Sequence, residues 1–172
     1  GWPDRLAYCG NIDLNASRRP VSFLRELAFG LGKGPCLAVE RADRHGMSFD
    51  YNGWKYADCL ASWTFPGYEG KPVWVRVLAR CGEVELLLNG QSLGRTKAGE
   101  LERLTTLFQV EYQPGQLTAI AYENGVEVGR DTLTTAGPAA ALRLTADRET
   151  ISAGGQGLAF ITADLTDAAG NW

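Results

Sequence analysis

Alternating apolar and polar positions dominate the chain from residue 33 onward and predict β-strands. The pattern recurs in three runs that lie between clusters of Gly, Pro and Asn. Because successive side chains of a strand point to opposite faces, each run predicts a strand with one buried face. The run 117–122 is rich in apolar and β-branched residues and predicts a fourth strand. The side chains expected inside are Val73, Val75, Val77, Val84, Leu86, Leu88, Phe108, Val110 and Tyr112.

Apolar residues at helical spacing occur earlier in the chain, before residue 33. Phe23, Leu24, Leu27 and Leu31 fall at helical spacing, with Pro20 before them and Gly30 and Gly32 near the end. Proline at the start and glycine at the end are typical of helix boundaries, so we predict one helix over 20–29. We expect this helix to be poorly anchored. Its apolar face, to which we also assign Phe29, must either dock on the β-structure or be exposed.

Two segments of similar sequence each follow a predicted strand. Residues 89–95 read NGQSLGR and residues 124–130 read NGVEVGR. Asn-Gly favours a type I′ hairpin turn, because both central residues need a positive φ. The second glycine of each segment is expected at a β-bulge. We therefore predict two hairpins of one β-sandwich, and we reject a phosphate-binding loop because neither segment opens a helix.

The chain divides into three predicted regions: residues 1–32 with the helix, a sandwich over 33–135, and a further β-region over 136–172. The linker-like sequence AGPAA at 136–140 begins the last region. Its apolar positions Leu142, Leu144 and 158–165 supply two or three strands, too few to close a sandwich. Gly at position 1 and an end just past a strand-like run lead us to expect a piece of a longer polypeptide.

Composition excludes several classes of protein. The 172 residues carry a net charge of −3, which does not suit a protein that binds nucleic acid through phosphate contacts. No apolar run approaches the length of about 20 residues that spans a bilayer. Hydrophobic residues make up 45% of the chain and aromatic residues 10%, which argues against disorder. The sequence thus predicts a globular, mostly β protein with no nucleic-acid partner and no membrane span.

The four cysteines and the one histidine predict neither a metal site nor a cofactor. The cysteines are separated by 22 to 27 residues, whereas a zinc site needs closely spaced ligands. We interpret the cysteines as buried or half-buried free thiols. Both a cytoplasmic and a bacterial periplasmic location are compatible with this usage. The cysteines are Cys9, Cys36, Cys59 and Cys81.

Candidate catalytic groups are sparse. A pair of carboxyl groups about 5–10 Å apart would suit hydrolysis of a glycosidic bond. The available acids lie in loop-like sequence, and we interpret them as solvated turn and cap residues. His45 could in principle activate a cysteine, but no cysteine stands in a nucleophile-like context. The acids considered are Asp13, Asp43, Asp50, Asp58 and Glu69.

Aromatic side chains crowd into residues 51–68. Trp54, Trp63 and Tyr68 are the candidates for contact with carbohydrate, because aromatic rings stack on the apolar faces of sugars. The alternative, which we favour, is that the rings fill the gap between a sandwich and a neighbouring domain. A carbohydrate-binding module and a structural or adhesive immunoglobulin-like module therefore both stay open as functions.

Four stretches resemble, in the same order along the chain, the region from the end of the catalytic barrel onward in bacterial β-galactosidases of glycoside hydrolase family 2. Residues 63–73 (WTFPGYEGKPV) and 84–94 (VELLLNGQSLG) resemble the β-sandwich that follows the barrel. Residues 8–14 (YCGNIDL), with Arg18-Arg19-Pro20 and Phe23, resemble the end of the (β/α)8 barrel. Residues 135–145 (TAGPAAALRLT) resemble the entry to the next immunoglobulin-like domain.

The resemblance implies an immunoglobulin-like sandwich behind the tail of a barrel at 1–32, with a truncated second domain at 136–172. It implies a parent enzyme that hydrolyses β-glycosides with retention, through two glutamates located upstream of the matched region. No catalytic residue is therefore carried over to this chain, and the chain by itself is expected to be inactive. The implied partners are the barrel, a β-galactoside at the parent's site, and further subunits if the parent forms a homo-oligomer.

Overall fold

A computed structural model describes residues 10–12, 17–46, 58–99 and 101–172. The chain divides into two compact units, Gly1–Thr134 and Thr135–Trp172. Within the described ranges, the first unit contains one α-helix and eight of the strands, and the second contains a two-stranded hairpin.

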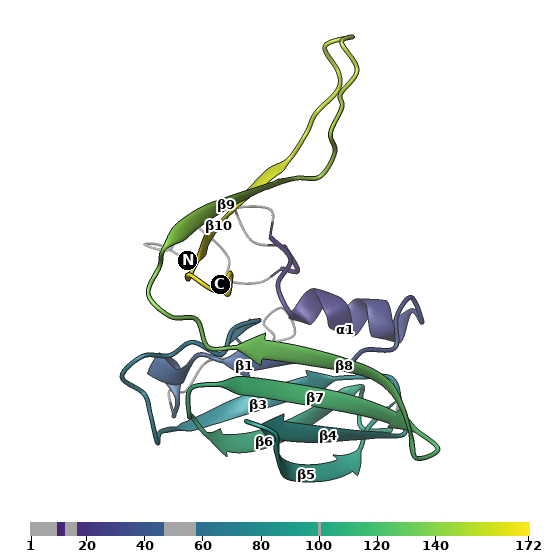
Figure 1. The fold of residues 1–172 in the computed structure, drawn as a ribbon. Helices are drawn as coiled ribbons and strands as arrows, with labels where there is room; N and C mark the ends of the chain where they lie inside the picture. The colour runs from purple at the N-terminus through teal and green to yellow at the C-terminus, as the bar shows by residue number, and fades with distance from the viewer. Residues whose placement is uncertain (1–9, 13–16, 47–57, 100) are drawn as a thin grey trace, which may run out of the picture. The chain divides into compact units, whose positions relative to one another are not determined.

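The first unit is a sandwich of two antiparallel sheets, which Figure 1 shows as two layers. The predicted β-sandwich is thereby confirmed. One sheet has the order β2-β1-β3-β6 and the other has the order β5-β4-β7-β8. The strands are β1 (Cys36–Glu40), β2 (Cys59–Leu60), β3 (Pro72–Leu78), β4 (Glu83–Leu88), β5 (Gln91–Lys97), β6 (Thr105–Glu111), β7 (Gln116–Glu123) and β8 (Val126–Thr134).

The core lies between the two sheets and follows the alternation in the sequence. Val73, Val75 and Val77 project inward from β3 and meet Val84 and Leu86 of β4, all at most 1% exposed. Fully burying each such side chain stabilises the fold by about 1.5–3 kcal/mol. The predicted inward faces of β3 and β4 are therefore confirmed, because a one-residue shift would expose the whole set.

Both predicted Asn-Gly hairpins are present. Asn89 and Asn124 have φ values of 52° and 51°, and the glycine after each has a φ of 81°, as a type I′ turn requires. The β4–β5 register skips Leu93, and the β7–β8 register skips Val128. Each skipped residue directly precedes the second glycine of its segment, so the predicted bulges are confirmed at equivalent positions of the two hairpins.

The helix α1 (Val21–Ala28) confirms the prediction over 20–29 and packs on the outer face of the first sheet. Leu27 is 2% exposed and lies in a cluster with Leu78 of β3 and Leu104. Arg80 donates a hydrogen bond of 3.1 Å from Nη1 to the Leu27 carbonyl and so satisfies the end of the helix. The helix is therefore docked, and the expectation that it is poorly anchored is wrong.

Phe29 corrects one part of that prediction. The sequence placed it on the docking face, but its side chain is 80% exposed. Phe29 is the C-cap residue, so it stands where the helix ends, and the chain then turns through Gly30 at a φ of 69°. Helical spacing no longer determines where a side chain points beyond that position.

The second unit consists of β9 (Ala141–Ala146) and β10 (Ile161–Thr166), paired antiparallel over six residues. Asp167 follows β10 and accepts hydrogen bonds from the backbone N–H groups of Gly137, Ala169 and Asn171 at 2.8, 2.9 and 2.8 Å. These bonds, with one from the Asn171 amide, lower the pKa of the Asp167 carboxyl to about 2. The carboxylate thus ties the segment entering β9 to the turn that leaves β10.

Candidate functional site

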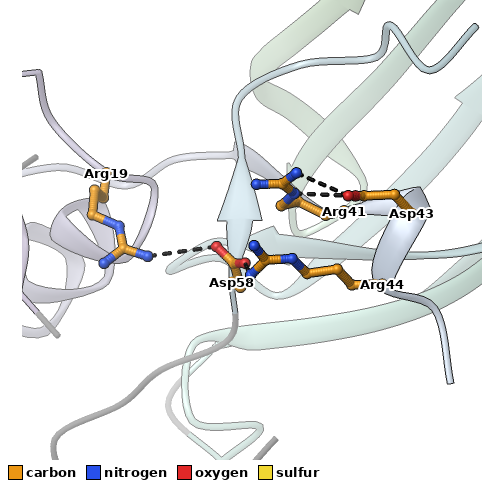
Figure 2. A network of polar contacts seen from close by, with 5 residues as sticks. All are labelled: Arg19, Arg41, Asp43, Arg44 and Asp58. Atoms are coloured by element: carbon orange, nitrogen blue, oxygen red, sulfur yellow. Dashed lines mark hydrogen bonds and ion pairs between the residues drawn. The ribbon is translucent and has the colours of Figure 1, made fainter. Parts of the chain in front are cut away.

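A network of five charged side chains joins the segment before α1 to one edge of the first sheet (Figure 2). Arg19 directly precedes the turn into α1, while Arg41, Asp43 and Arg44 belong to the short 3-10 helix η1 (Ala42–Arg44) and its N-cap. Asp58 stands immediately before β2 and lies between the two groups. The network therefore links parts of the chain that are up to 39 positions apart.

Asp58 is the central member of this network. Its Oδ1 atom lies 3.7 Å from Nη2 of Arg19, and its Oδ2 atom accepts a hydrogen bond from Nη1 of Arg44. The side chains of Arg19 and Asp58 are 23% and 31% exposed, so the pair is only partly screened by solvent. The Asp58 carboxylate thus contacts two guanidinium groups, that of Arg19 before α1 and that of Arg44 in η1. We call this meeting of the helical segment and the sheet edge, formed by Arg19, Arg44 and Asp58, the joint.

Arg41 and Asp43 form a second, local pair. The guanidinium of Arg41 donates two hydrogen bonds to the Asp43 carboxylate, at 3.1 and 2.9 Å. This bidentate contact lowers the pKa of Asp43. The pair spans only two positions, so it stiffens η1 without joining distant segments.

A further ion pair, separate from this network, lies on the outer face of the same sheet. Arg76 of β3 donates to Oε1 of Glu40 of β1 at 3.0 and 2.6 Å, and both side chains are less than a quarter exposed. Cys59 of β2 is buried near this pair, and burial raises the pKa of its thiol to about 12. This face therefore carries the Arg76–Glu40 ion pair and, near it, the Cys59 thiol, which stays protonated at neutral pH.

The cysteines do not supply a nucleophile in the described part of the chain. Cys36, Cys59 and Cys81 are free thiols, half-buried or buried as the sequence predicted, and Cys9 lies outside the described residues. Burial is the largest cause of a raised pKa at each of the three. A reactive cysteine needs the opposite shift, because the thiolate is the attacking species.

The carboxyl groups whose pKa is displaced also fail to match a glycosidase acid. The pKa is lowered, in each case mainly by hydrogen bonds to the carboxylate, at Asp43, Glu85, Glu127, Asp147 and Asp167. A general acid for glycoside cleavage needs a raised pKa so that it holds its proton. Glu69 accepts a hydrogen bond from the Gly67 amide within a turn, and the other two candidates, Asp13 and Asp50, lie outside the described residues.

Trp63, one of the three candidates for sugar contact, is 0% exposed. Its ring meets Tyr112 and Phe65 edge-on, with centroids 5.0 and 6.4 Å away, and its Nε1 donates to the Gln113 carbonyl at 2.9 Å. A ring without an exposed face cannot stack on a sugar in this conformation. Trp63 thus lies in the core of the sandwich itself, whereas the alternative interpretation had placed the ring between the sandwich and a neighbouring domain.

The other two candidates for sugar contact are Tyr68 and Trp54. Tyr68 is half-buried and packs against the edge of the core, while Trp54 lies outside the described residues. Sugar contact at these positions stays a prediction.

Across the parts that the structure describes, no group of three or more His, Cys, Asp or Glu side chains is placed to hold a metal ion. A search of the same residues for a membrane-spanning helix finds none with the required length and hydropathy.

Sequence reasoning singled out Asp43 and Asp58 but missed their arginine partners as site residues. The polar run at 41–46 was visible, and the spacing of Arg41 and Asp43 could have indicated a local pair. The Arg19–Asp58 contact left no such signal, because it depends on how the helix docks on the sandwich. The structure thus brings Asp43 and Asp58 into one network, in which each carboxylate contacts arginine side chains.

Comparison with known proteins places this architecture within larger enzymes. Residues 70–129, from β3 into β8, match a family described as "Domain of unknown function (DUF4982)". Over 172 residues and 99% of its length, the chain is 32% identical to "Beta-galactosidase BoGH2A" of Bacteroides ovatus, of which it covers 17%. It is 35% identical over 117 residues to a "Putative beta-glucuronidase" of Formosa agariphila, covering 64% of this chain and 11% of that protein.

A solved structure shows the same relation. A glycosyl hydrolase family 2 member from Bacteroides cellulosilyticus matches 94% of this chain at 38% identity with a TM-score of 0.83, and the match covers 21% of that protein. The matched segments therefore span between 11% and 21% of the length of these three relatives. This chain is homologous, over nearly all of its length, to a segment of glycoside hydrolase family 2 enzymes, as its sequence predicted.

Proposed function

We propose that this chain is a non-catalytic segment of a retaining family 2 glycosidase and that it braces the catalytic barrel. The observation that carries the proposal is the double attachment of residues 17–28 to the sandwich. Leu27 anchors α1 in a buried cluster, and Asp58 holds Arg19 at the entry to the helix. A segment fixed at two points transmits the rigidity of the sandwich to whatever precedes it.

The chemistry of the described side chains supports a bracing role. The charged groups at the joint are paired with one another, and the thiols are protonated by burial. Such groups stabilise a joint but offer neither a proton donor nor a nucleophile to a substrate. Hydrolysis of the glycosidic bond is accordingly assigned to the remainder of the parent enzyme.

The parent's substrate is proposed as a terminal β-galactoside. The support is the 32% identity over 172 residues to a protein named as a β-galactosidase. A second relative is named as a putative β-glucuronidase but matches only 117 residues. Comparing the full-length enzyme on an aryl β-galactoside and an aryl β-glucuronide tests this choice, and preference for the glucuronide would contradict it.

The bracing role predicts a specific defect for Asp58→Asn. Loss of the carboxylate charge weakens the contacts to Arg19 and Arg44, which we expect to lower the free energy of unfolding of the chain by about 1 kcal/mol. In the full-length enzyme, the half-life at elevated temperature should shorten while kcat/KM at low temperature stays unchanged. Denaturant unfolding measures the first effect and timed heat inactivation measures the second.

Asp43→Asn is the matched control for that experiment. It removes the same charge from the same network but breaks only the local pair with Arg41. We expect less than half the loss of half-life seen with Asp58→Asn. Equal effects of the two substitutions, or a fall in kcat/KM at low temperature for Asp58→Asn alone, would contradict a bracing role for the joint.

A further inference from the structure

The two Asn-Gly turns of the sandwich have the same backbone conformation but differ in what holds the asparagine side chain. Asn89 and Asn124 are both exposed, with φ values of 52° and 51°. A Cβ atom on the glycine that follows, Gly90 or Gly125, would meet nothing within 4 Å. Neither glycine N–H has a backbone acceptor in the described part of the chain, because the central N–H groups of a two-residue turn lie outside the strand ladder. Each turn therefore presents an open Asn-Gly pair to solvent.

The side chain of Asn89 is held by the neighbouring turn between β6 and β7. The N–H of Gln116 donates to its Oδ1 atom at 2.8 Å, and its Nδ2 atom donates to the Pro114 carbonyl at 3.1 Å. The amide lies so close to Gly115 that a Cβ atom there would be 1.8 Å from Oδ1. Both polar atoms of the amide are thus bound, in a position that only a glycine at 115 leaves open.

The side chain of Asn124 has no equivalent support. Among the described residues, the structure gives it no hydrogen-bond partner. The carboxylates nearby in sequence are bound elsewhere, since Glu123 accepts from the Gly82 N–H at 2.9 Å and Glu127 pairs with Arg130 at 2.8 Å. The Asn124 amide therefore keeps the rotational freedom that the amide of the other turn has lost.

We propose that Asn124 is a site of spontaneous deamidation through a succinimide, and that the β6–β7 turn protects Asn89 from the same reaction. A glycine after asparagine favours this chemistry, because no side chain hinders the attacking nitrogen. A solvent base takes the proton of the Gly125 N–H, and that nitrogen attacks Cγ of Asn124. The new C–N bond closes the ring, the bond from Cγ to Nδ2 breaks, and Nδ2 takes up a proton and leaves as ammonia. Water then opens the ring at either carbonyl and yields aspartate or isoaspartate.

The attack requires the asparagine side chain to turn until its Cγ atom faces the next backbone nitrogen. At position 89 this rotation breaks both hydrogen bonds of the amide, whereas at position 124 it breaks none within the described residues. The loss of two hydrogen bonds is enough to slow the reaction by about tenfold or more. The reaction consumes only water, so it does not depend on which glycoside the parent enzyme cleaves.

Deamidation changes the β7–β8 turn in a defined way. Either product replaces a neutral amide with a carboxylate, beside the existing carboxylates of Glu123 and Glu127. Isoaspartate also adds a methylene group to the backbone of the turn, which no longer fits the type I′ geometry. The modification therefore loosens the start of β8, an edge strand of its sheet.

Peptide mapping by mass spectrometry tests the proposal. The 172-residue chain is incubated at mildly alkaline pH, both folded and unfolded in guanidinium chloride, and aspartate and isoaspartate are quantified at each site. In the folded chain we expect Asn124 to react at least about tenfold faster than Asn89. In denaturant the two sites should react at similar rates, because the hydrogen bonds of Asn89 are lost. The Asn-Gly pair at 52–53, which lies outside the described residues, is followed in its own peptide.

Gly115→Ala is the variant that releases Asn89. The added Cβ atom displaces the amide, so the rate at Asn89 should rise by at least about fivefold. Asn124 lies at the opposite end of the β4–β7 pair, and its rate in the same samples should stay within about twofold as an internal control. Circular dichroism checks that the variant is folded, and if it is not, the comparison of the two sites in the unmodified chain decides alone.

Three results would overturn the proposal. Equal rates at Asn89 and Asn124 in the folded chain would mean that the hydrogen bonds give no protection. A difference that persists in guanidinium chloride would assign the selectivity to the neighbouring residues in sequence rather than to the fold. An Asn124 that reacts in denaturant but not in the folded chain over the same time would show that the turn itself blocks the attack.

Discussion

Replacing Trp63 with alanine is expected to lower the free energy of unfolding by about 3–5 kcal/mol. The ring is fully buried, contacts Phe65 and Tyr112 edge-on, and donates a hydrogen bond to the Gln113 carbonyl. Removing it leaves a cavity and an unpaired carbonyl at the same place. Denaturant unfolding followed by far-ultraviolet circular dichroism measures the loss without relying on tryptophan fluorescence.

Trp172→Ala is the control for this substitution. Trp172 is 61% exposed and belongs to the second unit, so its removal should change the free energy of unfolding by less than about 0.5 kcal/mol. If Trp63 were instead a platform for a sugar ring, its removal would leave stability nearly unchanged and abolish sugar binding. A stability loss below about 1 kcal/mol for Trp63→Ala would therefore contradict its assignment to the core.

Replacing Leu27 with alanine is expected to cost about 2–4 kcal/mol and to release α1 from the sandwich. Leu27 is 2% exposed and is the buried apolar side chain of this eight-residue helix, in one cluster with Leu78 and Leu104. A helix of this length is not stable alone, and its order depends on docking. Amide hydrogen exchange over 21–28 should rise by at least about tenfold in the variant.

Leu31→Ala is the control for Leu27→Ala. Leu31 is a leucine of the same segment, but it is 79% exposed, and its removal should change neither the exchange over 21–28 nor the free energy of unfolding by a measurable amount. Rapid exchange over 21–28 in the unmodified chain would contradict docking outright. Equal losses for Leu27→Ala and Leu31→Ala would show that the buried cluster does not hold the helix.

The features that could be predicted from the sequence are those that local chemistry determines. Alternation placed Val73, Val75 and Val77 in the core because the period of a strand is two. Asn-Gly at 89–90 and 124–125 predicted type I′ turns because few other residue pairs tolerate two positive φ values. Both signals lie within about ten residues of chain, so neither depends on the tertiary fold.

The site was harder to predict because it depends on contacts between distant parts of the chain. Arg19 and Asp58 meet only after α1 docks, and the local sequence around either residue does not indicate the other as its partner. An aromatic cluster at 51–68 carries the same local signal whether its rings line a core or face a sugar, and burial of Trp63 is visible only in the structure. Phe29 fits the helical spacing but stands just beyond the helix.

Catalytic competence of the isolated chain is the most direct measure of its role. The central claim is that these 172 residues support a glycosidase without performing its chemistry. The purified chain is assayed on an aryl β-galactoside and an aryl β-glucuronide beside the full-length enzyme at equal molar concentration. The account predicts turnover by the full-length enzyme and none above the uncatalysed rate by the chain, and turnover that stays with the chain through repurification would contradict it.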